Sequence, residues 1–374
     1  MSEIRVRYVN LPLQYKTIGS EIDEAIKNVL EQGNFILGKE IKEFEDRFAK
    51  YCGCKYALGV ANGTDALILT MKALGIGKGD EVIPVPNSFI STTASIVHVG
   101  AKPVFVDVRD DYNMNPGLIE DAITSHTKVI LPVHLTGRPA EMNPILEIAQ
   151  EHDLYVIEDA AQAVGAKYYE KRVGSFGTAG CFSLHPLKNL NAYGDGGMIT
   201  INDRELYDKL AKLRNHGLRT RDECELWGYN SRLDTIQAAI VNVKLAHLDE
   251  WTKRIREIAS FYQKHLSGLV KVPVDKPYEE AVYHTFIIQC DKRDELQKYL
   301  LERGIETKIH YPIPIHLQDS AKGFGYKRGE FHVAETQAKR ILSLPIYPEL
   351  TNEQMEMVTN EIRRFYSIRA SCYL

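Results

Sequence analysis

The segment Cys181-Phe-Ser-Leu-His-Pro-Leu-Lys188-Asn-Leu-Asn-Ala-Tyr-Gly-Asp-Gly-Gly197 places one lysine in a stretch whose only other formal charge is Asp195. A lysine whose ammonium is poorly solvated has a lowered pKa, and it then reacts with carbonyl groups to form a Schiff base. A lone lysine in a loop is more often an ordinary surface residue. The case for chemistry at Lys188 therefore depends on the rest of the chain.

Short apolar segments alternate with segments of helical periodicity on both sides of the lysine segment. This alternation predicts an α/β fold with a mainly parallel central sheet and helices on both faces. The expected strands are residues 56–60, 81–85, 103–107, 128–133, 154–159, 180–183 and 197–201, and the expected helices are residues 20–32, 39–51, 66–74, 91–99, 116–123 and 144–152.

Sites in such a sheet form at the carboxyl ends of the strands. Asp159 ends one expected strand, Asn62-Gly63-Thr64 follows another, and Pro86-Asn-Ser-Phe89 follows a third. Lys188 comes after the strand that ends at Ser183, so all four groups are expected to converge on one crevice.

The turn Gly63-Thr64 lies between an expected strand and an expected helix. The free N–H groups at the start of a helix bind phosphate, and glycine lets the backbone approach the anion closely. A helix with a good cap and no ligand is an equally good interpretation of this turn alone. The turn is no Walker motif, because no Gly-Lys-Ser/Thr follows it.

The C-terminal third changes character. A long helix over residues 233–266 is expected to connect two domains, and a strand, helix, strand and helix follow over residues 283–289, 293–303, 308–311 and 352–364. The sequence therefore predicts a large domain of residues 1–245, with an N-terminal helical segment, and a small α+β domain of residues 246–374.

The composition suits a soluble globular protein: 44% of the 374 residues are hydrophobic and 26% are charged. The net charge of −4 argues against nucleic acid as a partner. The N-terminus does not look like a signal peptide, and no apolar run is long enough to span a membrane. The six cysteines include no Cys-x-x-Cys pair, and no histidine pair has a metal-ligand context. We expect a cytoplasmic protein with free thiols and without a metal.

One ligand would use all the groups at the strand ends. Its phosphate would bind Gly63, Thr64 and Ser183, its ring would stack on Phe89, and its aldehyde would react with Lys188. Its pyridine nitrogen would stay protonated beside a buried carboxylate, for which Asp159 is placed. That ligand is pyridoxal 5′-phosphate.

Six segments then resemble, in order along nearly the whole chain, the motifs of the DegT/DnrJ/EryC1/StrS sugar aminotransferases. They are Asn62-Gly-Thr-Asp-Ala-Leu67, Glu158-Asp-Ala-Ala-Gln-Ala163, Phe182-Ser-Leu-His-Pro-Leu-Lys188-Asn-Leu, Gly194-Asp-Gly-Gly197, Gly228-Tyr-Asn-Ser-Arg-Leu-Asp234 and His310-Tyr-Pro-Ile-Pro-Ile-His316.

The resemblance implies the fold of type I pyridoxal-phosphate enzymes, which is that of aspartate aminotransferase, and a homodimer with composite active sites. It makes Lys188 the residue that forms the Schiff base and later moves the proton. It places Asp159 at the pyridinium nitrogen, Gln162 near the ring hydroxyl, and Asn230 at the phosphate of the neighbouring subunit's cofactor. Gly63, Thr64, Ser183 and Phe89 keep the roles given above.

Five further residues are candidates for contact with the substrate: His185, Arg232, His310, Tyr311 and His316. Each histidine also has an ordinary interpretation, since His185 can support the lysine loop and the other two can be core or surface residues. Arg232 can serve an ordinary ion pair, although its place in the motif favours an anionic substrate group.

The lysine segment departs from the family pattern at two positions. Leu184 stands where many relatives have phenylalanine, and Asn191 where many have glycine. Leu135-Thr136-Gly137 also stands where a tyrosine often precedes the glycine. These changes leave the catalytic groups in place and bear on the shape of the substrate pocket.

The resemblance implies transfer of an amino group from glutamate or glutamine to a keto sugar, expected to be a nucleotide-linked keto-deoxy sugar. The product would be an amino sugar for a surface polysaccharide, such as a lipopolysaccharide, or for a natural product. Free keto sugar acids and keto-inositols are alternative substrates. A sugar dehydratase of the same fold is disfavoured because Lys188 is present, and a cofactor-bound regulator without activity ranks lower still.

Overall fold

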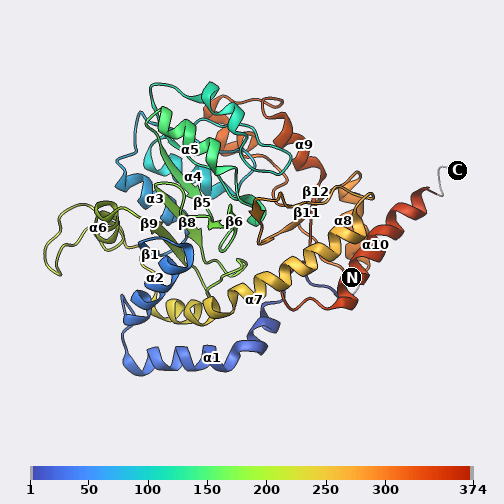
Figure 1. The fold of residues 1–374 in the computed structure, drawn as a ribbon, viewed down its shortest axis with the longest axis horizontal. Helices are drawn as coiled ribbons and strands as arrows, with labels where there is room; N and C mark the ends of the chain where they lie inside the picture. Colours follow the sequence, from blue (N-terminus) through green and yellow to red (C-terminus); the bar gives the residue numbers. More distant parts are fainter. Residues whose placement is uncertain (1–2, 371–374) are drawn as a thin grey trace.

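The computed structural model describes residues 3–370 and has a seven-stranded central sheet in the order β1-β9-β8-β5-β4-β2-β3 (Figure 1). Only β9 runs against the other strands, because it pairs antiparallel with both β1 and β8 while the remaining pairs are parallel. The predicted α/β fold with a mainly parallel sheet is confirmed. The strands are β1 (Tyr56–Val60), β2 (Glu81–Ile83), β3 (Lys102–Pro103), β4 (Thr127–Ile130), β5 (Tyr155–Asp159), β8 (Ala179–Ser183) and β9 (Gly197–Ile201).

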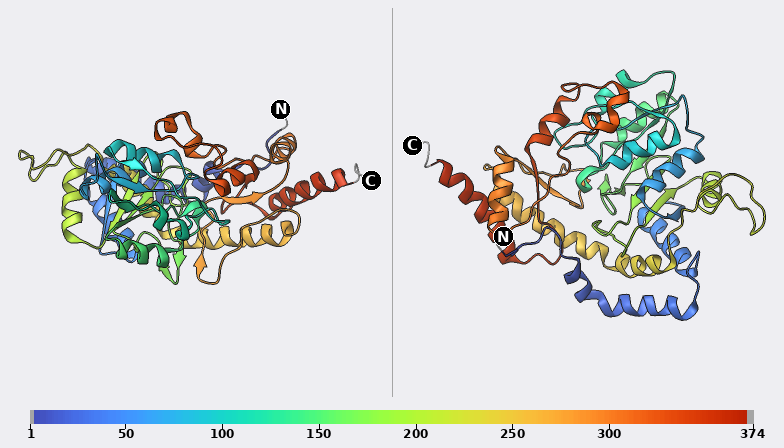
Figure 2. Two further views of the ribbon diagram at one scale, coloured as in Figure 1. Left: turned by 90° about the horizontal axis from the view of Figure 1, so that it is seen from above. Right: turned by 180° about the vertical axis from the view of Figure 1, so that it is seen from behind.

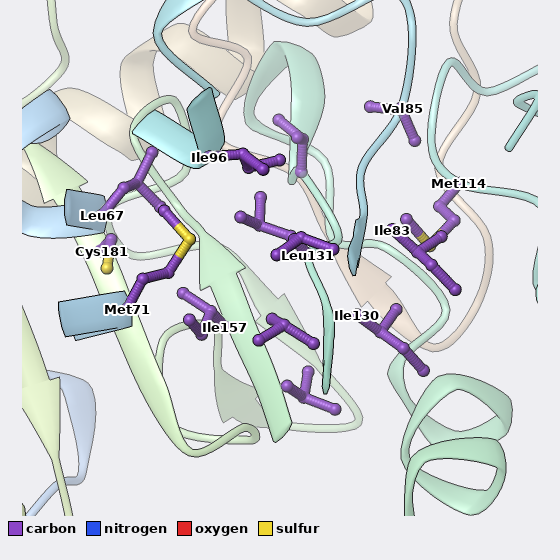
Figure 3. Packing of buried hydrophobic residues seen from close by; sticks show 14 of the residues in the cluster. Leu67, Met71, Ile83, Val85, Ile96, Met114, Ile130, Leu131, Ile157 and Cys181 are labelled. Carbon is purple, nitrogen blue, oxygen red and sulfur yellow. The ribbon is translucent and has the colours of Figure 1, made fainter. Parts of the chain in front are cut away.

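Alternate side chains of a strand point to opposite faces of the sheet, so this sheet has apolar side chains on both faces. Helices cover both faces and bury these side chains. Ile199 and Ile201 of β9 belong to the cluster that includes side chains of α3 (Gly63–Ala73), whereas Met198 belongs to the cluster under α2 (Lys39–Cys52). The first cluster also contains residues of α4 (Ile90–Val99), α5 (Met142–Glu151) and α6 (Arg204–Leu213). Figure 3 shows the contact at its centre, where Leu67 and Met71 of α3 face Ile157 of β5.

The small domain is built on a two-stranded antiparallel sheet of β11 (Phe286–Gln289) and β12 (Ile341–Leu344). The long α7 (Thr235–Leu266) passes from beneath the large sheet to this domain, where α8 (Arg293–Glu302) and α10 (Asn352–Ala370) also pack (Figures 1 and 2). Two segments cross between the domains: Val6 packs in the small core, and α9 (His332–Arg340) returns to the large one. The boundary between residues 245 and 246 stays a prediction.

Several predicted elements need correction. The first helix, α1 (Leu11–Gln32), begins well before residue 20, because Ile18 and Ile22 pack on Ile240 of α7 and bury one face of an otherwise polar segment. Residues 116–123 form two 3₁₀ turns, η1 (Pro116–Leu118) and η2 (Glu120–Ala122), instead of a helix. The predicted strand at residues 308–311 is wrong, since only Lys308 makes a bridge there, with Ser343.

Helices α6 and α9 were not predicted. Helix α6 had a usable signal, since Leu206, Leu210 and Leu213 recur at helical spacing, whereas the inward face of α9 carries only alanine and polar side chains. Also not predicted were β12 and a small antiparallel sheet of β6 (Lys167–Tyr168), β7 (Lys171–Arg172) and β10 (Glu279–Glu280). Three further 3₁₀ turns are η3 (Leu135–Gly137), η4 (Ile315–Leu317) and η5 (Asp319–Phe324). Within residues 3–370, none of the helices has the length and apolar character needed to cross a lipid bilayer.

Candidate active site

A cavity of about 650 Å³ lies where β1, β5 and β8 end, between the large domain and three small-domain segments: residues 284–285 before β11, residues 310–311, and Ile346 after β12. Its volume is within the range of sites that enclose small organic ligands. The cavity brings together most of the predicted site residues, although they are far apart in the chain. Those that line it are Gly63, Thr64, Phe89, Asp159, Gln162, Ser183, His185, Lys188, His310 and Tyr311.

The phosphate-binding end of the cavity is the start of α3. Asn62 caps this helix by accepting a hydrogen bond from the Asp65 amide at 2.8 Å. The amides of Gly63 and Thr64 occupy the first two helical positions, where N–H groups have no partner within the helix and suit an anion. A Cβ atom on Gly63 would lie 2.9 Å from the Cβ of Ser183, so only glycine fits beside that serine.

Asp159, at the carboxyl end of β5, is 5% exposed and forms no ion pair with any described residue. Its carboxylate accepts hydrogen bonds from the Thr92 hydroxyl at 2.7 Å and from the Ala161 amide at 3.2 Å. Burial raises the pKa of this carboxyl, and the two hydrogen bonds and the charge of Lys188 act in the opposite direction. A buried carboxylate held in this way suits a cationic ring nitrogen as its partner.

A second buried carboxylate fixes the strand end that carries Asp159. Glu158 accepts hydrogen bonds from the amides of Gly174 at 2.6 Å and of Phe176 and Gly177 at 2.8 Å. His134 Nε2 lies 3.0 Å from the same carboxylate, and His134 Nδ1 accepts a hydrogen bond from the Ala140 amide at 2.9 Å. Because Nδ1 is an acceptor, we assign the proton to Nε2, which donates to Glu158. These contacts hold the end of β5 rigidly beneath the cavity.

Lys188 projects from the loop between β8 and β9, and burial lowers its pKa to about 8, although the nearby charge of Asp159 raises it. A substantial fraction of the amine is therefore neutral near physiological pH and able to attack a carbonyl carbon. The Lys188 amide donates to the His185 carbonyl at 2.8 Å, and the Leu187 amide donates to His185 Nδ1 at 3.3 Å. His185 thus lines the cavity and also supports the turn that presents the lysine.

The opposite wall carries neutral polar groups. Gln162 donates to the Tyr311 hydroxyl at 3.3 Å and accepts from the Thr136 amide at 2.8 Å, and the Tyr311 ring lies 5.7 Å from that of Phe89. Burial, followed by the charge of Lys188, lowers the pKa of His310 to about 4. The same two causes place the pKa of His284 well below its usual value. Both imidazoles are therefore neutral at physiological pH.

Three predicted site residues do not line this cavity. Asn230 is exposed and its backbone pairs with Asn215, whose side chain accepts a hydrogen bond from Arg232 at 2.9 Å. His316 is 2% exposed, lies 3.0 Å from a Glu335 carboxylate oxygen, and packs against the ring of Phe331. The structure therefore places His316 in the contact between η4 and α9, away from the lining residues.

The lining residues that were not predicted from the sequence include Tyr8, Thr92, Asp195 and His284. Thr92 and Asp195 had a usable signal, because each lies within a few residues of a predicted site residue or motif. Tyr8 and His284 had none, since both are remote from the motifs and reach the cavity only through the packing of the two domains.

The residues at the cavity fit pyridoxal 5′-phosphate. The helix start at Gly63 and Thr64 suits its phosphate, Asp159 suits its ring nitrogen, and Lys188 suits its aldehyde. Glu120, Glu151 and His152 form an exposed group of potential metal ligands, but none of them lines the cavity, and the absence of a metal stays a prediction.

Comparison with known proteins supports this assignment. Residues 16–363 match the model of the DegT/DnrJ/EryC1/StrS aminotransferase family. A pleiotropic regulatory protein of Geobacillus stearothermophilus is 45% identical over 97% of this chain and 99% of its own. A dTDP-3-amino-3,4,6-trideoxy-alpha-D-glucose transaminase of Streptomyces venezuelae is 42% identical over 96% of both chains. The crystal structure of S. venezuelae DesV in complex with a ketimine intermediate superposes with a TM-score of 0.95 at 41% identity, over 97% of this chain and 99% of that one.

Proposed function

This chain belongs to the DegT/DnrJ/EryC1/StrS aminotransferase family, whose members depend on pyridoxal 5′-phosphate, and on that premise we propose that it transfers an amino group from glutamate or glutamine to a nucleotide-linked keto sugar. The observation that carries the proposal is Lys188, with its lowered pKa, between Asp159 and the start of α3 in one cavity. The dTDP-sugar named for the Streptomyces venezuelae relative supports a nucleotide-linked substrate.

Pyridoxal phosphate supplies an electron sink for the carbanion that forms when the donor loses its α-proton. Lys188 would take this proton and deliver it to the former aldehyde carbon of the cofactor, a task for which a pKa near 8 is well suited. Asp159 would hold the ring nitrogen of the bound cofactor protonated. The amides of Gly63 and Thr64 and the side chain of Ser183 hold the phosphate. His284 and His310 line the cavity as neutral imidazoles and add no positive charge to it.

We infer that the active unit is a homodimer with composite sites. Asn230 is exposed, and the bridge between Ile36 and Asp234 brings the turn 35–37 close to its segment. Phe35, Ile36 and Leu37 are at least 40% exposed, and Trp227 is 93% exposed. Exposed apolar side chains around one segment favour a protein interface, and a second copy of the chain would bring Asn230 to the partner's cofactor phosphate.

Mixed dimers test this arrangement. Chains with Lys188→Ala and chains with Asn230→Ala are each expected to be nearly inactive. A heterodimer of the two should regain up to half of the activity per dimer, because one of its two sites has both residues intact. Activity is measured after subunit exchange, with heterodimers identified by two different affinity tags. If tagged heterodimers form and activity stays at the level of the parents, Asn230 serves its own subunit.

The substrate proposal is tested by a half-reaction. The protein, converted to its pyridoxamine form with glutamate, is mixed with nucleotide-linked keto sugars, free keto sugar acids and keto-inositols, and recovery of the aldehyde form is followed by absorbance. We expect rapid recovery with a nucleotide-linked keto sugar. If the aldehyde form recovers only with a free keto sugar acid or a keto-inositol, the proposed nucleotide-linked substrate is wrong, but the protein is still an aminotransferase.

The Geobacillus relative's description as a regulatory protein favours a second candidate, a cofactor-bound regulator. Glutamate distinguishes the two, because an aminotransferase converts the bound cofactor to its amine form and a regulator without activity does not. Cysteine usage supports a cytoplasmic location for either, since Cys52, Cys54, Cys181, Cys224 and Cys290 are all free thiols. We propose that the product amino sugar serves a surface polysaccharide or a natural product.

A further inference from the structure

A second, smaller cavity lies behind the lysine loop, between the N-terminal part of α1, the middle of α7 and the segment 346–349. Lys188, Leu187 and His284 contribute to the lining of both cavities. The smaller one has a volume of about 60 Å³, on a scale where one buried water occupies roughly 10–15 Å³. It therefore has room for about four water molecules.

Three buried polar side chains line this cavity, and each has atoms without a hydrogen-bond partner in the described chain. Asn191, 1% exposed, has neither its amide nitrogen nor its amide oxygen bonded. The side-chain oxygen of Gln14, which is 8% exposed, also has no hydrogen-bond partner. Neither has the hydroxyl of Thr252, which is 7% exposed. Buried polar atoms in folded proteins are almost always hydrogen-bonded, so a cluster of such atoms at one cavity points to a ligand.

The ligand must offer both donors and acceptors. Asn191 presents a donor and an acceptor, Gln14 presents an acceptor, and Thr252 presents a hydroxyl that can do either. Glu349 also lines the cavity, and Lys244, which is buried on α7 with its amine over the ring of Tyr193, opposes the rise in the pKa of Glu349 that burial causes. A simple anion would meet the side chain of Glu349, and a simple cation would leave the amide donor of Asn191 without a partner.

We propose that this cavity is a binding site for a cluster of internal water molecules, which joins Asn191 of the lysine loop to Gln14 of α1 and Thr252 of α7. Water satisfies donors and acceptors alike, and a cluster of this size bridges groups that do not touch. Asn191 is thus a positioning residue, three residues after the lysine.

A double-mutant cycle with Asn191→Leu and Thr252→Val tests the site in the full-length, cofactor-loaded protein. If water bridges these side chains, each substitution should destabilise the protein and lower its folding equilibrium constant by about tenfold, because waters in the cluster lose a hydrogen-bond partner. The double variant should lose less than the product of the two, because both changes break one network. The side chains of Asn191 and Thr252 share no direct hydrogen bond, so coupling between them requires a bridge.

Thr93→Val is the matched control. Thr93 is 4% exposed and its hydroxyl also lacks a partner, but it does not line this cavity. Removing a stranded hydroxyl should leave stability unchanged or improve it. If Thr252→Val and Asn191→Leu behave like Thr93→Val, or if their effects are independent, the cavity is dry and the proposal is wrong. A high-resolution crystal structure that shows no water within hydrogen-bond distance of the Asn191 amide would overturn it as well, whether or not the variants fold.

The positioning role makes a kinetic prediction that a purely structural role does not. Asn191→Leu should lower kcat by about tenfold through displacement of the lysine, with KM for the donor within about twofold of its original value. Asn191→Ser, which keeps a hydroxyl and leaves room for one more water, should recover most of the rate. A loss that appears mainly in KM, or one that Asn191→Ser does not reverse, would contradict the role. These tests compare variants of one protein with the same two substrates, so their outcome does not depend on which sugar is the natural substrate.

Discussion

Replacement of Lys188 by alanine is expected to abolish transamination while leaving the fold intact. The amine both captures the cofactor aldehyde and carries the proton between two carbons, so its removal deletes covalent and acid–base catalysis together. We expect kcat to fall by more than about 10⁴-fold, since acid–base catalysis alone contributes roughly 10²–10⁴. The measurement is single-turnover conversion of glutamate, which separates chemistry from product release.

Two comparisons make the Lys188 result specific. Burial of the lysine is unfavourable for its charged form, which is why its pKa falls to about 8, so the alanine variant should unfold at the same or a higher denaturant concentration. Lys209→Ala, which removes an exposed lysine of α6, should retain the original rate. A small primary amine added to Lys188→Ala should restore part of the proton transfer. Turnover near the original rate in Lys188→Ala would refute the assignment of the active site.

Replacement of Asp159 by asparagine is expected to preserve cofactor binding and to lower activity by about 10²-fold or more. The neutral amide is nearly the same size, but it removes the negative charge that holds the ring nitrogen protonated. The buried carboxylate has a raised pKa because of desolvation, so folding itself should tolerate the amide. The rate of α-proton removal from glutamate, measured by exchange of deuterium from the donor, reports on this step directly.

Thr92→Val is the matched control for Asp159. It removes the 2.7 Å hydrogen bond to the carboxylate and keeps the charge in place. The loss in this variant should therefore be much smaller than in Asp159→Asn. Equal losses would mean that the orientation of the carboxylate matters more than its charge, and an unchanged rate in Asp159→Asn would make this residue a structural cap.

The alternation of apolar and periodic segments was sufficient to predict most of the sheet. Strands in a parallel sheet are buried on both faces, so segments such as residues 128–133 and 155–159 carry an apolar signal that needs no tertiary information. The same logic placed Gly63, Asp159 and Ser183 at one edge, because they follow the carboxyl ends of strands that lie in one sheet. The antiparallel direction of β9 was beyond this reasoning, since a short apolar strand looks alike in both directions.

Helices α1 and α9 show the limit of periodicity. Most of their surface is polar, and their few apolar residues are inward only because α7 and the loop at Asp107 lie against them. The Asp107 carboxylate accepts hydrogen bonds from the Val333 and Ala334 amides at the start of α9, at 2.8 and 3.0 Å. A cap supplied from more than two hundred residues away leaves no local pattern to detect.

The sequence by itself determined the chemistry of the site, because Lys188, Asp159 and Gly63 each belong to a local strand-and-turn pattern that positions one functional group. Tertiary structure alone decided the environment of those groups. Tyr8 and His284 reach the cavity, His316 is withdrawn from it to pair with Glu335, and Asn191 faces a separate polar cavity. The lowered pKa of Lys188 is also decided by the tertiary structure, because desolvation depends on every segment that packs around the amine. The residues next to Lys188 in the chain do not determine this desolvation.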